Sequence, residues 1–395
     1  MPNWRRVAVT AAGIWLGTRA AYVLFTYFSF VFGANQPTTA AALLEAWGQW
    51  DAHWYELISR LGYFSPASVA FLPLYPALVG GLAALLGDGA GPVYPAVDDL
   101  RLGVLLAVAN LGTLLGFIGL GLLAEREGPE GDRGIAARTL LLLAAFPFAF
   151  YFAAGYAEGP FLAAVTFSLY FARRGRWWWA AAASFLAALA RPNAVALYPA
   201  LVWEYGRGHG WWARTRRWPS LRGAAEAVAV LGAMPLAIAG FVVYTWARFG
   251  SPLVFLRVSS TDWHRQLSPP WLTAARLLHR LLNVPLLSPQ EADLLLELVP
   301  VLVVVLVLLV AIRRLPLAFT LYVFGLIALA VAAPVPSQYE LIVSAGRHVA
   351  LAVPVFIVVA GWLRDRPALT AAVVASGFLV QAALLGIFLR GGWVA

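Results

Sequence analysis

The chain is built from long apolar runs in which polar residues are rare and do not alternate with apolar ones. Only helices and closed barrels can cross a lipid bilayer, and barrel strands would show alternating segments of about ten residues. Continuous runs rich in Ala, Leu and Val therefore predict an all-α polytopic membrane protein. About eleven transmembrane helices are expected, at residues 7–32, 101–124, 136–152, 157–172, 177–189, 193–205, 225–248, 294–312, 316–333, 349–363 and 368–389.

Two of these runs, 177–189 and 193–205, are too short to cross a bilayer core of about 30 Å alone. They meet at Ala190-Arg191-Pro192-Asn193, which predicts a broken helix pair. No internal repeat, linker or soluble segment separates from the rest of the chain. We expect one integral membrane domain over 1–395, with a core at 1–205 that includes the broken pair at 177–205, and a C-terminal transmembrane module at 206–395.

Composition excludes a soluble fold. Of the 395 residues, 62% are hydrophobic and 12% are charged, against about 45–50% and 25% in soluble domains. Because the chain has no cysteine, disulfides, thiolate metal sites and cysteine nucleophiles are excluded. We interpret the net charge of +9 as a signal of membrane topology and predict no nucleic-acid partner.

Arginine placement predicts the orientation. Most arginines of the short loops fall on one side if the N-terminus is cytoplasmic, as the positive-inside rule requires. This works only if the apolar stretch 71–86 does not cross and lies in the interface, and only if the broken pair at 177–205 crosses twice. The expected location is the cytoplasmic (plasma) membrane, with large external segments at 33–100 and 249–293 and an active site on the external face.

The first external segment contains one misplaced carboxylate. Residues 39–61 predict a single amphipathic helix, and Asp51 falls on its apolar side between Trp47 and Ile58. A buried carboxylate needs a partner or a function. One interpretation is a general base at the outer membrane surface, beside aromatic rings that suit sugars. The alternative is an ion pair with Arg19 in the first span.

Arg191 lies between the two half-helices of the broken pair. Pro192 is well placed as the first residue of the second half, whose N-terminus would direct free N–H groups and a positive dipole toward an anion. Arginine suits bidentate contact with phosphate, so we predict a phosphate site here. The alternative is that Arg191 snorkels to the membrane surface or pairs with Glu158.

Further candidate site residues lie at the predicted external ends of other spans and in the second external segment. Arg347 and His348 form a second cationic pair at the start of the tenth span, and Glu158 stands at the outer end of another. The second external segment carries Trp263-His264-Arg265, which fits a substrate-contacting loop, although a short interfacial helix would look the same. We find no Asp-x-Asp, no HExxH and no dinucleotide fingerprint, so no metal ligand is predicted and a divalent metal requirement is undetermined.

Several short segments taken together resemble a known family. They are Trp50-Asp51-Ala52-His53-Trp54-Tyr55, Phe71-Leu72-Pro73-Leu74-Tyr75-Pro76, Tyr156-Ala157-Glu158, Ala190-Arg191-Pro192-Asn193, and Gly250-Ser251-Pro252 with Trp263-His264-Arg265. In order and spacing they resemble the PIG-V-like mannosyltransferases of the GT-C superfamily of multispanning glycosyltransferases. Ala157 and Ser251 depart from the family pattern, where Pro and Asp are common.

The resemblance implies a GT-C fold with interfacial helices in the first external loop. It further implies inverting transfer of a sugar, usually mannose, from a polyprenyl- or dolichyl-phosphate donor to a lipid or glycolipid acceptor. No other cofactor is implied. The expected base is Asp51, and Arg191, Arg347 and His348 are the expected donor-phosphate ligands. The remaining expected substrate contacts are Trp50, Trp54, Tyr55, Tyr75, Glu158, Asn193, Trp263, His264 and Arg265.

The sequence is also compatible with a function other than an enzyme's. A transporter or scramblase of lipids or lipid-linked sugars would use the same arginines to bind headgroups, without a base. Such a protein would tolerate Asp51→Asn, whereas a transferase would not.

Overall fold

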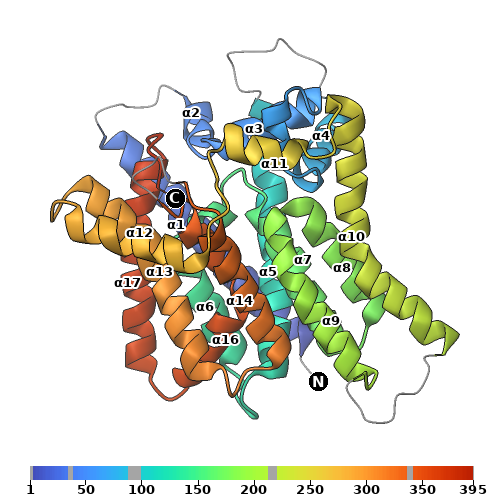
Figure 1. Cartoon of the computed structure of the whole chain (residues 1–395). Coiled ribbons are helices and arrows are strands. Elements are labelled where there is room, and N and C mark those ends of the chain that lie inside the picture. Colours follow the sequence, from blue (N-terminus) through green and yellow to red (C-terminus); the bar gives the residue numbers. More distant parts are fainter. Residues whose placement is uncertain (1–2, 34–38, 88–98, 212–219, 336–340, 395) are drawn as a thin grey trace.

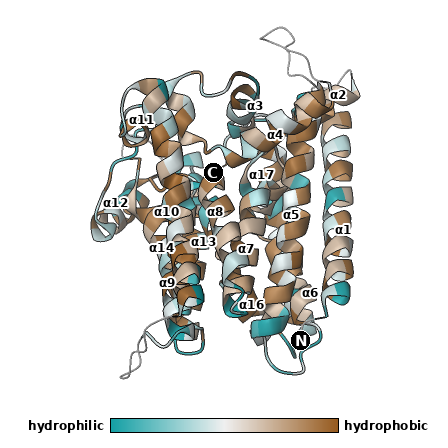
Figure 2. Ribbon diagram, turned by 90° about the vertical axis from the view of Figure 1, so that its right-hand side faces the viewer, coloured by the Kyte–Doolittle hydropathy of each residue, from teal (hydrophilic) through white to brown (hydrophobic). Residues whose placement is uncertain are grey.

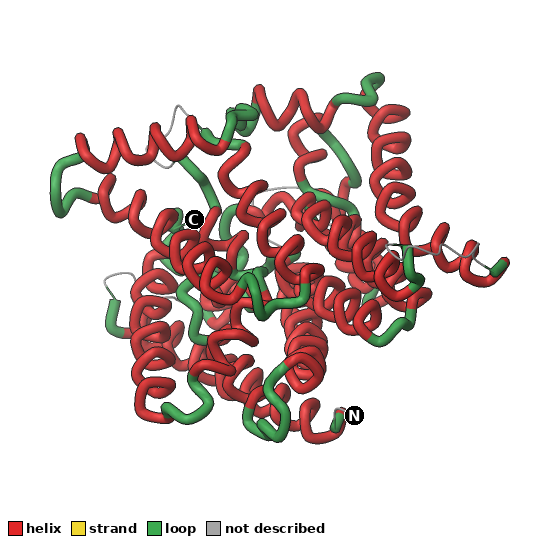
Figure 3. Tube along the Cα trace, turned by 60° about the horizontal axis from the view of Figure 1, so that its bottom comes forward, coloured by secondary structure: helices red, strands yellow, loops and turns green. Residues whose placement is uncertain are grey.

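The computed structural model describes residues 3–33, 39–87, 99–211, 220–335 and 341–394. This part of the chain consists of helices joined by loops (Figure 3), so the predicted all-α class is confirmed. The α-helices are α1 (Trp4–Val31), α2 (Ala40–Glu45), α3 (Asp51–Leu61), α4 (Leu74–Leu85), α5 (Asp99–Glu127), α6 (Ile135–Ala144), α7 (Glu158–Arg173), α8 (Trp177–Ala190), α9 (Leu197–Gly208), α10 (Leu221–Phe249), α11 (Val254–Thr261), α12 (Pro270–Asn283), α13 (Pro289–Ala311), α14 (Leu317–Ala332), α15 (Ala345–Val349), α16 (Val353–Trp362) and α17 (Pro367–Phe388). Short 3₁₀ helices are η1 (Pro66–Ala70), η2 (Ala149–Phe152) and η3 (Pro192–Ala196).

Five helices among the described residues are long and apolar enough to cross a membrane: α1, α5, α10, α13 and α17. Polar side chains fix where several of them begin. Asn3, Ser220 and Ser288 each accept a hydrogen bond from a backbone N–H in the first turn, of α1, α10 and α13 respectively. Brown, apolar stretches of the ribbon are prominent along α5 in Figure 2. This is the architecture of a multi-pass membrane protein, while the exact number of crossings stays a prediction.

The helix bundle has two distinct ends. The short helices α2, α3, α4 and α11 gather at one end of the bundle, and the N-terminus lies at the other (Figures 1 and 2). The predicted non-spanning stretch 71–86 corresponds to α4, whose 12 residues give a length of roughly 18 Å. That is well short of a bilayer core. Parts of the predicted external segment 33–100 and of the loop carrying Arg214, Arg216 and Arg217 lie outside the described residues.

The predicted continuous helix over 39–61 is wrong. It is divided into α2 and α3, because Trp50 has a φ of 55° that no helix interior can contain. Gly48 in the connection lies so close to α5 that a Cβ there would be 2.9 Å from Leu102 Cδ1. The interruption places Asp51 at the first residue of α3, where a carboxylate interacts favourably with the helix dipole.

The predicted span 136–152 is also interrupted. Helix α6 ends at Ala144, ahead of Pro147, and the chain turns through η2 before α7. The carbonyl groups released by this break bind side chains of neighbouring helices. Phe152 O accepts from Arg19 Nη2 at 3.1 Å and from Thr113 Oγ1 at 2.6 Å, and Ala153 O accepts from Asn110 Nδ2 at 2.9 Å.

Arg19 is therefore a brace for this break. Its Nε also donates to Asn110 Oδ1 at 2.7 Å. The alternative pairing of Arg19 with Asp51 is wrong: the guanidinium donates instead to Phe152 O, Asn110 Oδ1 and Thr18 Oγ1, whose partial negative charges stabilise it inside the bundle. The segment braced in this way leads directly into Glu158.

The broken pair over 177–205 is confirmed. Helix α8 ends at Ala190, Arg191 is extended at φ −152° and ψ 147°, and Pro192 opens η3 before α9 begins at Leu197. Extended geometry is what a residue before proline prefers. The break directs the Arg191 side chain away from both helix axes and into the bundle, where its exposed fraction is 9%.

Candidate functional site

Four charged side chains from distant parts of the sequence form one cluster. Arg347 donates to Glu158 Oε1 from Nε at 3.1 Å and from Nη2 at 2.6 Å, and Nη2 also reaches Asp51 Oδ2 at 2.9 Å. Arg191 Nη1 lies 2.6 Å from the same Glu158 oxygen. Two carboxylates are thus balanced by two guanidinium groups, and the alternative pairing of Arg191 with Glu158 is confirmed.

Each member stands at a helix end or a break. Asp51 begins α3, Glu158 begins α7, Arg191 separates α8 from η3, and Arg347 lies on the short helix α15. Glu158 and Arg347 are almost fully buried, whereas the Asp51 side chain keeps 20% of its surface exposed. Asp51 is therefore the carboxylate of the pair that a substrate can reach.

Arg347 is enclosed by aromatic rings. Its guanidinium carbon is 4.4 Å from the ring centre of Tyr151 and 4.8 Å from that of Tyr156. Burial opposes its charge, but the carboxylates of Glu158 and Asp51 outweigh burial and hold the Arg347 pKa well above its ordinary value. Arg347 thus stays protonated and fixes Asp51 and Glu158 in one geometry.

Glu297 fixes the start of α15, the helix that carries Arg347, and was not predicted from the sequence. Its carboxylate oxygens accept the backbone N–H groups of Ser344 at 2.8 Å, Ala345 at 2.6 Å and Gly346 at 3.4 Å, at the start of α15. Glu297 is 2% exposed and belongs to the apolar helix α13. A carboxylate within a predicted span is itself a signal of function or structure, and that signal could have identified it.

Several buried polar atoms around the cluster make no hydrogen bond within the described chain. They are Arg191 Nε, Asn193 Nδ2, His348 Nδ1, Glu158 Oε2 and Tyr151 Oη. Native proteins satisfy nearly all buried polar atoms, so a group of unsatisfied ones indicates a place where a ligand can supply partners. Among these atoms, the Arg191 and Asn193 nitrogens are obligate donors, as a phosphate oxygen requires.

Arg265 adds a further cation near this cluster. It lies close enough to experience the charges of Asp51, Arg191 and Arg347. Burial lowers its pKa, and no side-chain hydrogen bond or ion pair joins it to the described residues. The loop that carries it is fixed by Gln266 N and Ser268 N, which donate to Pro334 O and Ala332 O.

Aromatic side chains predicted to bind substrate gather beside Asp51. The Trp54 ring stacks on Phe71 with centroids 5.4 Å apart and meets Trp263 edge-on at 6.0 Å. Trp50 is exposed and touches Trp393 edge-on at 5.3 Å. A substrate role for these residues stays a prediction.

Tyr55, Tyr75 and His264 occupy different surroundings. Tyr55 is buried edge-on against Tyr75 at 4.8 Å, within the field of the charged cluster. Tyr75 is fully buried, and its hydroxyl donates to Leu105 O at 2.8 Å, so its polar atom already has a partner. His264 is exposed, with a φ of 51°. Their substrate roles also stay predictions.

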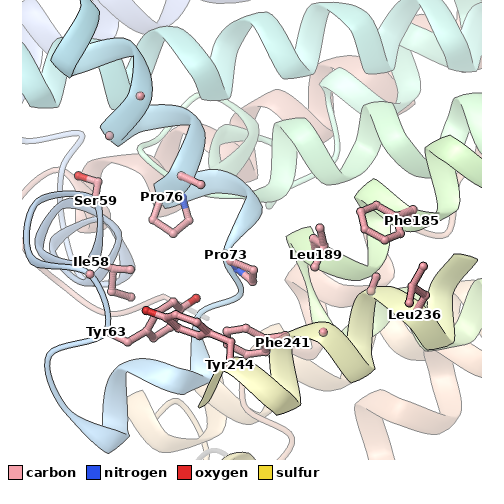
Figure 4. A pocket seen from close by; sticks show the side chains of 16 residues that line it. Ile58, Ser59, Tyr63, Pro73, Pro76, Phe185, Leu189, Leu236, Phe241 and Tyr244 are labelled. Atoms are coloured by element: carbon pink, nitrogen blue, oxygen red, sulfur yellow. The ribbon is translucent and has the colours of Figure 1, made fainter. Parts of the chain in front are cut away.

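An apolar cavity of about 730 Å³ is enclosed by four helices (Figure 4). It lies between α3 and α4 on one side and α8 and α10 on the other. Leu189, two residues before Arg191, and Ile58, one turn beyond Tyr55, both line it. Its lining residues are Ile58, Ser59, Gly62, Tyr63, Pro73, Pro76, Ala77, Gly80, Gly81, Phe185, Leu189, Leu236, Ala237, Gly240, Phe241 and Tyr244.

No group of three or more potential metal ligands occurs among the side chains that the structure describes. In the charged cluster, Arg347 stands between the carboxylates of Asp51 and Glu158.

His348 gives the site a testable pH dependence. Burial, reinforced by neighbouring arginines, lowers its pKa well below the ordinary value of 6.5. As the pH falls through that ordinary value, the unfolded chain binds a proton that the folded protein does not, so acid favours unfolding. We expect His348→Gln to reduce the loss of thermal stability between about pH 7.5 and 5.5, measured in nanodiscs. His279→Gln, on an exposed surface, should leave the loss unchanged; equal behaviour of both variants would contradict the expectation.

Comparisons with known proteins give a limited result. No family model matches the chain, and no curated protein matches it in sequence. Among solved structures, it is similar to three crystal forms of the Archaeoglobus fulgidus oligosaccharyltransferase. With zinc and sulfate the TM-score is 0.44 at 14% identity, in the apo form 0.42 at 13%, and with a tethered acceptor peptide 0.41 at 12%.

Each match covers 96% of this chain and 53%, 56% and 55% of the archaeal chain, respectively. The chain therefore spans about half the length of that enzyme. At these TM-scores, nothing about the activity of this chain follows from the likeness.

Proposed function

We propose that the protein is an inverting GT-C-type glycosyltransferase. It transfers a hexose, with mannose the first candidate, from a polyprenyl- or dolichyl-phosphate carrier to a lipid or glycolipid acceptor. The observation that carries the proposal is the cluster itself: a reachable carboxylate, Asp51, fixed beside an arginine-lined region with unsatisfied donors, together with an apolar cavity. A base, a phosphate site and a place for a hydrocarbon chain are the parts that this reaction needs.

In this mechanism Asp51 is the general base. Its Oδ2 is held by Arg347, while no hydrogen bond from the described residues occupies Oδ1. An acceptor hydroxyl donates to Oδ1, loses its proton there and attacks the anomeric carbon from the side opposite the departing phosphate. General base catalysis of this kind contributes about 10²–10⁴-fold.

Arg191 stabilises the departing phosphate in this proposal, with Arg265 and the Asn193 amide as further donors. Arg191 uses one nitrogen for Glu158 and keeps Nε unpaired. Arg347, which was predicted from the sequence to bind the phosphate, directs its Nε and Nη2 at the carboxylates of Glu158 and Asp51. We therefore assign it to holding Asp51 rather than to binding the donor.

The apolar cavity fits the hydrocarbon chain of the donor. A chain that begins at a phosphate on Arg191 would pass Leu189 and Phe185 along α8, opposite Leu236 and Phe241 of α10 (Figure 4). Gly81 and Gly240 leave space along this path, since nothing lies within 4 Å of where their Cβ atoms would be. Burying methylene groups there contributes about 0.8 kcal/mol each.

The direct test is transfer by purified protein in nanodiscs. Radiolabelled mannosyl and glucosyl polyprenyl phosphates are supplied with lipid and glycolipid acceptors, and product formation is measured. Transfer of either sugar that is lost in Asp51→Asn supports the proposal. Passage of lipid-linked sugar across the bilayer without transfer, unchanged by that substitution, would instead establish a transporter.

The orientation of the site is tested by labelling. Because the chain has no cysteine, single cysteines report without background. His53 on α3 and Arg174, which follows α7 at the end away from Glu158, are both exposed. In intact cells, a membrane-impermeant maleimide should label His53→Cys from outside and leave Arg174→Cys unlabelled. The reverse labelling pattern would place the N-terminus outside the cell and the charged site on the cytoplasmic side.

A further inference from the structure

Helix α12 has three surfaces of different character. Thr273 and Leu277 are buried against the rest of the protein. At 100° per residue, Trp271, Leu278 and Leu282 form a second stripe, which is exposed by 76%, 59% and 74%. The remaining surface carries a cationic stripe with Arg276 and Arg280, on which His279 and Leu272, the latter 40% exposed, also lie.

The helix projects from the side of the bundle, across the direction of the long helices (Figure 1). Its 14 residues give a length of roughly 21 Å, too short to cross a bilayer core. The two arginines on one side also exclude full immersion in hydrocarbon. An apolar stripe beside a cationic one is the pattern of a helix that lies in the membrane interface.

The loop after α12 extends the apolar surface. Leu286 and Leu287 are 84% and 99% exposed, and Leu287 has a φ of 58°. A left-handed conformation is strained for leucine, so the surrounding structure must hold it. Glu291 Oε2 accepts the Leu287 N–H at 2.5 Å, while Ser288 Oγ accepts the Glu291 N–H at 3.1 Å at the start of α13. A fixed tip of two leucines is thereby presented outward.

We propose that α12 and the Leu286–Leu287 tip form a membrane anchor that docks on a bilayer surface rich in anionic phospholipids. The apolar stripe and the tip enter the boundary of the acyl chains, while Arg276 and Arg280 bind headgroup phosphates. Charge complementarity selects this partner, since the stripe beside the apolar one is cationic. The anchor does not depend on the proposed catalytic activity.

Docking also has a consequence for the charged site. The anchor belongs to the same external segment as Arg265, joined to it through residues 266–269. Gln266 N and Ser268 N donate to Pro334 O and Ala332 O at the C-terminal end of α14. The segment is therefore attached to the bundle at this point and, through the anchor, to the membrane surface.

The test uses single cysteines at Leu282 and, as the matched control on the cationic stripe, at His279. Each carries an environment-sensitive fluorophore in the full-length protein, reconstituted in phosphatidylcholine alone or mixed with phosphatidylglycerol. We expect brominated acyl chains to quench the probe at Leu282 strongly and the probe at His279 weakly, with aqueous iodide showing the opposite preference. Equal access of iodide to both positions would overturn the proposal.

The arginines are tested in the same system. The Arg276→Gln/Arg280→Gln variant should lose the gain in quenching that phosphatidylglycerol produces, with the ratio of docked to undocked forms falling about fivefold per arginine. Trp271→Ser should reduce quenching in both lipids. A gain that survives removal of both arginines, or disulfide-linked dimers formed through Leu282→Cys, would assign the surface to neutral lipid or to a second copy of the chain and overturn the proposal.

Discussion

Asp51→Asn is expected to abolish turnover while leaving the affinity for the lipid-phosphate donor nearly unchanged. Asparagine retains an oxygen that can accept from Arg347, so the geometry shown by the 2.9 Å contact is preserved. It cannot take up the proton of the acceptor hydroxyl, and the rate should fall by about 10²–10⁴-fold. Single-turnover rates measured beside donor binding by calorimetry check both halves of the expectation.

Glu45→Gln is the matched control for this experiment. Glu45 belongs to the same segment between α1 and α5 and is exposed at the end of α2, outside the charged cluster. Its substitution removes one carboxylate from the same face of the protein and should leave turnover unchanged. Retained turnover in Asp51→Asn would remove the assignment of the base, whereas loss in both variants would indicate an effect of surface charge.

Arg191→Ala should fail differently, because a phosphate ligand acts on the bound donor and on the departing phosphate alike. Donor affinity and turnover should fall together, with a loss of about 10²–10³ in catalytic efficiency. The variant should still fold, since Glu158 keeps its contacts with Arg347 at 2.6 and 3.1 Å. Calorimetric donor affinity and steady-state kinetics on the same preparation measure the effect.

Two further variants make this result specific. Arg191→Lys keeps the charge but not the planar fork, so an intermediate loss is expected. Arg222→Ala removes an exposed arginine that also pairs with a glutamate, at 3.1 Å, and should change neither quantity. Unchanged donor affinity in Arg191→Ala would move the phosphate site, and Arg265 would then be tested next.

The parts of the fold that the sequence predicted were those set by local chemistry. Continuous apolar runs identified α1, α5, α10, α13 and α17, because a bilayer demands such runs wherever a helix crosses it. The break at Arg191 was predictable for a similar reason, since proline removes a backbone donor and restricts the residue before it. None of these predictions needed knowledge of a distant contact.

The parts that escaped prediction depend on three-dimensional packing. A wheel plot assumes a continuous helix, so it could not show that Trp50 turns the chain and starts α3 at Asp51. The choice of Arg19 as a partner for Asp51 failed because the true partner, Arg347, lies 296 residues away. Helix α12 was detectable from its periodicity. A mean hydropathy over a window does not detect it, because the apolar and the charged sides of the helix cancel in the mean.

Because Asp51 and Arg347 lie 296 residues apart, the order of synthesis decides when the charged cluster is completed. Glu158 and Arg191 stand at the two open ends of the α7–α8 hairpin and can pair early, whereas α15 is made long after α3 has left the ribosome. Until α15 arrives against Glu297, Asp51 lacks the guanidinium that orients it. The charged cluster is therefore completed by one of the last elements to be made, so in a half-made chain Glu158 and Arg191 can already pair while Asp51 still lacks its guanidinium partner.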